Sequence, residues 1–109
     1  MDILPLARES FDHLRVLGVT FAPLMAAALQ HARDDLRRAV LLTAYVYSRL
    51  PREKHTRRIA LPMRQRVLDR AAATHPTATV ESWLRSGERL TEDQAAAIAF
   101  DGAPLDAMR

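Results

Sequence analysis

The stretch FAPLMAAALQHARDDLRRAVLLTAYVYSR, residues 21–49, decides the fold class of this chain. Alanine and leucine dominate both halves, and no alternation of β-branched and polar residues occurs, so the stretch favours α-helix over β-strand. The Arg33-Asp34 pair interrupts the apolar pattern only briefly, and Asp34 is expected to cap a helix that begins at Asp35. Two helices joined by so short a link must fold back as an antiparallel hairpin.

The segments on either side of this hairpin predict four more helices. With the hairpin included, the apolar spacing predicts helices over residues 4–17, 21–32, 35–49, 62–74, 78–86 and 92–100. Gly18 and Gly87 are expected to end the first and fifth helices, and Thr20 to cap the second. Residues 50–61 are expected to form a loop after Pro51, with Pro62 in the first turn of the fourth helix.

The last predicted helix has a strong start signal. Thr91 and Gln94 form a capping box before an alanine-rich run, and Asp101-Gly102 closes that helix. Trp83 is expected to be a core anchor. A helix-turn-helix over residues 91–109 is not expected, because only seven residues follow Gly102 and a recognition helix does not fit.

The predicted fold is therefore all-α, with about six helices arranged as stacked antiparallel helical hairpins of tetratricopeptide-like kind. Residues 24–51 fit a degenerate form of that repeat, with matching positions at Ala27, Leu36, Ala39, Val46 and Pro51. We expect one domain over residues 1–102, followed by a C-terminal tail over residues 103–109.

Composition excludes several classes of protein. The 109 residues include no cysteine, which excludes disulfides, thiolate zinc sites and a cysteine nucleophile, and suits the cytoplasm. The sequence has no run of 18 apolar residues and no signal peptide at its start, so no membrane association is expected.

Catalytic and metal-binding patterns are missing as well. The four histidines are scattered, no serine lies in a GxSxG motif, and the three glycines are isolated. We therefore expect no enzymatic activity, no cofactor and no metal site.

Positive charge is concentrated in one segment. Residues 49–70 carry eight basic residues against Glu53 and Asp69, a net charge of +6, whereas residues 71–109 carry a net charge of −3. Such a segment attracts phosphates if its charges share one face. However, no aromatic residue is interleaved for base stacking.

Three stretches of the chain carry a resemblance to a known family. They are the hairpin of residues 21–49, LPMRQRVLDRAAATHP at residues 61–76, and WLRSGERLTEDQAAAIAF at residues 83–100. Over residues 10–102 the chain resembles the C-terminal helical region of large bacterial regulators that join a predicted ATPase to tetratricopeptide-like helices. Those regulators carry a LuxR-type or winged-helix DNA-binding domain at one end. The chain itself is expected to contain neither the ATPase nor the DNA-reading domain.

The resemblance implies a protein-interaction module in bacterial transcriptional or signalling regulation. The expected partner is a protein segment, an upstream ATPase or regulator domain, or a second copy of the chain, because hairpin stacks leave an apolar end open. The residues expected to bind it are Tyr45, Tyr47, Arg49, Arg57, Arg58, Arg64 and Arg66. The alternative is a small nucleic-acid-associated protein that binds phosphates through residues 49–70.

Overall fold

Helices account for most of the chain in the computed structural model, which describes residues 3–15, 21–50, 54–102 and 105. The side chains of residues 21, 54–57 and 59 are also outside this description. The described residues form six helices and no strand, so the predicted all-α class is confirmed. They are α1 (Leu4–Arg15), α2 (Phe21–His31), α3 (Leu36–Arg49), α4 (Lys54–Thr74), α5 (Thr77–Glu88) and α6 (Glu92–Phe100). The predicted features at Gly18, Thr20 and Pro51, and all of the predicted tail except Leu105, lie outside the described residues.

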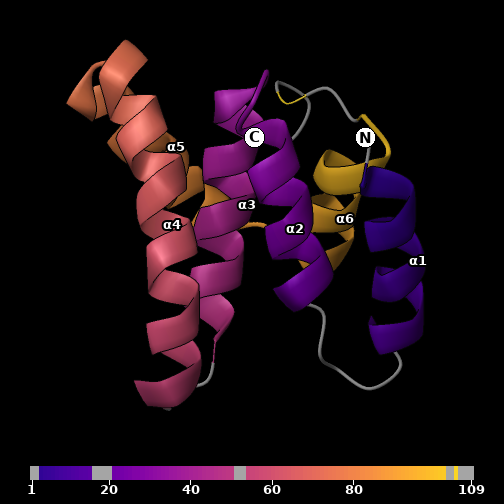
Figure 1. Ribbon diagram of the computed structural model, residues 1–109. Helices are drawn as coiled ribbons and strands as arrows, with labels where there is room; N and C mark the ends of the chain where they lie inside the picture. Colours follow the sequence, from indigo (N-terminus) through magenta and orange to yellow (C-terminus); the bar gives the residue numbers. More distant parts are fainter. Residues whose placement is uncertain (1–2, 16–20, 51–53, 103–104, 106–109) are drawn as a thin grey trace.

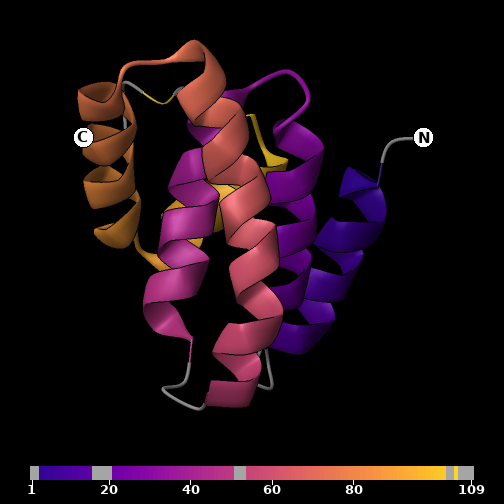
Figure 2. The same cartoon turned by 60° about the vertical axis from the view of Figure 1, so that its left-hand side comes forward.

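Helix α3 lies at the centre and packs against α2, α4, α5 and α6 (Figure 1). Helices α1 and α4 lie on opposite sides of the α2–α3 pair, and Figure 2 shows α5 at the edge away from α1. Each helix from α1 to α4 packs on the next one along the chain, which is compatible with stacked hairpins. The last helix, α6, returns to contact α1, α2 and α3.

The core lies on both sides of α3. Leu42 and Val46 join a cluster shared mainly with α1, α2 and α6, whereas Ala39 and Val40 join a second cluster shared with α4 and α5. Trp83, predicted as a core anchor, is half-buried and packs against the edge of both clusters. Burying a large aliphatic side chain stabilises the fold by about 1.5–3 kcal/mol, so α3 is fixed from both sides.

The turn between α2 and α3 confirms the hairpin and corrects its cap. Asp34, predicted as the cap, is exposed, and the N-cap is Asp35, whose carboxylate accepts a hydrogen bond of 3.2 Å from the Arg38 backbone N–H. The prediction was wrong by one residue because residues 32–34 are needed for the turn. The Asp35 backbone N–H donates to the His31 carbonyl at 2.7 Å and closes that turn.

Helix α4 corrects the largest error of the sequence prediction. Residues 54–61 were predicted as part of a loop, but they belong to one helix that continues through Pro62 to Thr74. An internal proline costs a helix about 3 kcal/mol because it removes a backbone donor and crowds the preceding turn. Here Pro62 is exposed, while Ala60, Val67 and Ala71 of the same helix are buried against the rest of the fold. Tertiary packing therefore outweighs the local penalty.

The ends of α5 and α6 gave one error and one confirmed prediction. Gly87 was predicted to end the fifth helix, but it is buried inside α5, which runs to Glu88. In α6 the capping box is present: the Thr91 hydroxyl accepts from the Gln94 backbone N–H at 3.1 Å, and the Gln94 side chain accepts from the Thr91 backbone N–H at 2.9 Å.

Among the described helices, none combines the length and the apolarity needed to span a membrane.

Ion pairs at both ends of α6 attach it to α1. Arg8 pairs with Asp101 at 2.5 Å beyond the C-terminal end of α6, and Arg15 pairs with Glu92 at 2.9 Å in its first turn. Arg15 also pairs with Asp93, and the Arg15 guanidinium has a raised pKa because of its hydrogen bond to Asp93. The helix dipole favours acidic residues in the first turn of a helix, so Glu92 and Asp93 are stabilised both by the α6 dipole and by Arg15.

Candidate interaction surface

The residues predicted to bind a partner do not form one surface. Tyr45 is buried, with only 6% of its area exposed, and burial raises the pKa of its hydroxyl. The Arg49 guanidinium lies 4.3 Å from the centre of the Tyr45 ring and donates hydrogen bonds to the carbonyls of Glu88 (3.0 Å) and Leu90 (2.7 Å). This pair therefore holds the end of α3 to the connection between α5 and α6.

A second pair joins α3 to α4. The Arg64 guanidinium lies 4.8 Å from the centre of the half-buried Tyr47 ring, a distance at which a cation is attracted to the ring face. Arg64 is itself only partly exposed. Tyr47 and Arg64 therefore contribute to packing, and neither presents its polar group freely to a partner.

The remaining predicted residues lie on α4. Arg58 is exposed, and the side chain of Arg57 is outside the described residues. Arg66 is exposed and lines a hollow between α2 and α4. Of the predicted residues whose side chains the structure describes, Arg66 is the one that lines this hollow.

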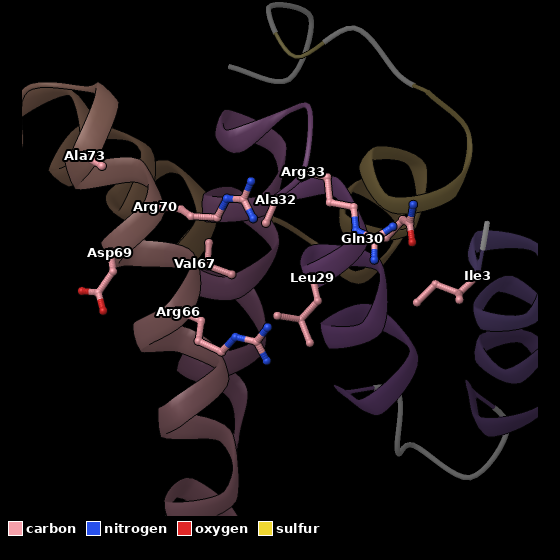
Figure 3. A pocket seen from close by; sticks show the side chains of 10 residues that line it. All are labelled: Ile3, Leu29, Gln30, Ala32, Arg33, Arg66, Val67, Asp69, Arg70 and Ala73. Atoms are coloured by element: carbon pink, nitrogen blue, oxygen red, sulfur yellow. The ribbon is translucent and has the colours of Figure 1, made fainter. Parts of the chain in front are cut away.

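The hollow beside Arg66 has a volume of about 690 Å³ and combines an apolar floor with a basic rim. Leu29 is the half-exposed part of the apolar floor, whereas Ala32 and Val67 line it as buried residues. Figure 3 shows Arg66 and Arg70 reaching from α4 toward α2, and Arg33 extending from the chain just after α2. We call this hollow the α2–α4 groove; its other lining residues are Ile3, Gln30, Asp69 and Ala73.

The charge of the α2–α4 groove is not neutralised by its own residues. Among the described residues, no acidic side chain forms an ion pair with Arg33, Arg66 or Arg70. Asp69 is directed away from the groove in Figure 3, and its carboxylate accepts a hydrogen bond of 2.8 Å from Gln65. The groove therefore presents three cations around an apolar floor, which suits a ligand with both acidic and apolar groups.

A smaller hollow of about 340 Å³ adjoins the groove and shares Arg33 with it. It is lined by residues of both charges, among them Asp34, Asp35 and Arg37, and by His75 and Trp83. The two rings contact each other edge to face, with their centres 4.9 Å apart. Because its charges are mixed, this hollow has less preference for a ligand of one sign than the α2–α4 groove.

The described residues give no support for metal chemistry. Within them, no group of three histidine, aspartate or glutamate side chains is arranged to hold a metal ion. The arrangement at the groove can bind and orient an anionic segment, and the residues described there include no nucleophile beside a general base.

In comparisons with protein-family models, curated proteins and solved structures, no match to this chain was found. Sequence reasoning did not select Arg33 and Arg70 as binding residues. Arg70 follows Arg66 by four residues, which places both on one side of a helix once α4 is recognised as continuous. Arg33 carries no such signal, because only the packing of α2 beside α4 brings it to the groove.

Proposed function

We propose that this chain is a non-enzymatic protein-interaction module that binds a segment of a partner protein in the α2–α4 groove. The proposed setting is bacterial transcriptional or signalling regulation. Its support is the resemblance of residues 10–102 to the helical region of ATPase-linked bacterial regulators. The partner is a separate protein or a regulator domain that lies upstream in such an assembly.

One observation carries the proposal: three arginines without acidic partners surround an apolar floor on the described surface. Protein interfaces gain most of their affinity from a few well-buried anchors, and arginine is frequent among them. An apolar partner side chain on Leu29 and Ala73 would gain free energy from burial of apolar surface, while the arginines would set its orientation.

The proposal is tested by filling the groove. Ala73 lines the groove and is exposed, so Ala73→Trp would occupy the space without disturbing the core. Ala72→Trp is the matched control, because Ala72 is exposed on the same helix and does not line the groove. Peptides are first selected from a random displayed library on the unaltered chain, and their affinities for both variants are then measured by fluorescence anisotropy.

We expect the selected peptides to lose about tenfold or more in affinity for Ala73→Trp and to bind Ala72→Trp as they bind the unaltered chain. Circular dichroism of both variants checks that the helices are retained. Selection of no peptide, or equal loss of binding in both variants, contradicts the proposal.

A further inference from the structure

The geometry of the α2–α4 groove points to the chemistry of its ligand. We infer that the partner segment is an acidic amphipathic helix, whose apolar stripe lies on Leu29 and Ala73 and whose carboxylates pair with the three arginines. This inference rests on the proposed function and deepens it. A neutral apolar segment would also fit a peptide-binding groove, so the two can fail separately.

The spacing of the arginines on α4 sets the spacing of the acids. Arg66 and Arg70 are four residues apart on one helix, so their positions differ by about 6 Å along its axis. A partner helix laid along α4 presents two carboxylates with the same rise when they are also four residues apart. Arginine binds carboxylates through two parallel hydrogen bonds, which adds orientation to the attraction.

Arg33 extends the pattern to the other wall of the groove. It lies just after α2, whereas Arg66 and Arg70 belong to α4, so cations flank the apolar floor on both sides. The matching ligand has an apolar stripe with acidic residues on both flanks. This amphipathic pattern is typical of a helix that binds in a groove through one face.

The lining of the groove favours a protein ligand over a nucleic acid. None of its ten described lining residues is aromatic, so bases have no ring to stack on. A phosphate backbone would satisfy the arginines but would leave the apolar floor uncovered. An acidic helix satisfies both parts of the groove at once.

Two designed helical peptides test the inference on the full chain by isothermal titration calorimetry. The first has a leucine stripe flanked by glutamates spaced four residues apart, and the second has every glutamate replaced by glutamine. The groove variant is the double substitution Arg66→Glu, Arg70→Glu. Its matched control is Arg85→Glu, Arg89→Glu, which reverses two exposed arginines with the same spacing away from the groove.

We expect the glutamate peptide to bind the unaltered chain more tightly than the glutamine peptide. The groove reversal should weaken binding of the glutamate peptide about tenfold or more, whereas the control reversal should change it less than about threefold. A third peptide with lysine in place of glutamate should gain affinity for the groove variant. Emission from Trp83, which packs against both core clusters, checks that each variant is folded.

Three results would overturn the inference. Equal affinity for the glutamate and glutamine peptides shows that charge does not select the ligand, and the proposed function then survives only if Ala73→Trp weakens both. Equal weakening by the two reversals shows that net charge acts without a site. Tighter binding of duplex DNA than of the glutamate peptide in the same titration shows that phosphate is the preferred ligand.

Discussion

Gly87 on α5 faces Leu41 on α3 so closely that no side chain fits between the two helices. A Cβ atom at Gly87 would overlap the Leu41 carbonyl oxygen and would lie 2.7 Å from the Ala44 Cβ atom. The overlap involves backbone, so one whole helix must move to relieve it. The glycine that the sequence suggested as a helix terminator is therefore a packing residue.

Replacing Gly87 by alanine should lower the free energy of unfolding, because the added methyl group forces α5 away from α3. Overpacking of this kind typically costs about 1–3 kcal/mol, and the gain in helix propensity from alanine recovers up to about 1 kcal/mol of it. Urea denaturation measures the difference. Ser86→Ala, at the exposed neighbouring position, is the control, and a Gly87→Ala protein as stable as that control contradicts the close packing.

Thr43 is expected to weaken the fold through its hydroxyl group. The side chain is completely buried, and its Oγ1 atom has no hydrogen-bond partner within the described part of the chain. Thr43→Val keeps the shape and removes the buried polar atom, so the free energy of unfolding should rise by about 1–2 kcal/mol. Thr74→Val, at an exposed position, should change it little. Loss of stability in Thr43→Val would mean that the hydroxyl is in fact satisfied.

Tyr45 should make the fold sensitive to alkaline pH. Burial is the largest cause of its raised pKa, and the negative charge of Glu92 adds to it. In the unfolded chain tyrosine has a pKa of about 10. The contribution of the neutral hydroxyl is therefore complete below that pH and is lost as pH rises through the higher pKa of the folded state.

The substitution Tyr45→Phe isolates this effect. From about pH 8 to pH 11 the unaltered chain should lose more free energy of unfolding than the Phe variant, as measured by urea denaturation. Between about pH 6 and pH 8 the difference in the free energy of unfolding between the two proteins should stay constant. Tyr45 does not ionise in that range in either the folded or the unfolded chain. Parallel curves over the whole range would argue against the raised pKa.

Binding to duplex DNA should be weak, although residues 49–70 carry a net charge of +6. Arg49 and Arg64 are engaged with Tyr45 and Tyr47, so they are not available as a continuous phosphate-binding track. We expect no saturable binding of duplex DNA at about 50 mM salt in a fluorescence anisotropy titration. Saturable binding whose logarithm falls steeply with the logarithm of salt concentration would favour the nucleic-acid alternative instead.

The sequence predicts the helices well where local signals agree with packing. The capping box at Thr91 and the short turn between α2 and α3 are specified by residues close in sequence, and both are present. Pro62 misled the prediction because a local rule disfavours proline inside a helix, while the buried residues of α4 on either side keep that helix continuous. Tertiary contacts of this kind cannot be read from a local pattern.

The candidate site was predictable only in part, for the same reason. Arg66 was identified from the density of basic residues, and Arg70 follows from helical spacing once α4 is known to be continuous. Arg33 is separated from Arg66 by 33 positions, and only the packing of α2 beside α4 brings the two to one groove. Arg49 and Arg64 looked available for binding in the sequence. In the structure their guanidinium groups lie over the rings of Tyr45 and Tyr47.

The central claim is that the α2–α4 groove holds the partner segment, and the most direct test is a two-dimensional NMR titration of the isotope-labelled chain with the glutamate peptide. The largest shifts should fall on the backbone amides of Leu29, Ala32, Val67 and Arg70, which line the groove. Largest shifts on α1 or on the exposed side of α5, with the groove amides unchanged, would contradict the account.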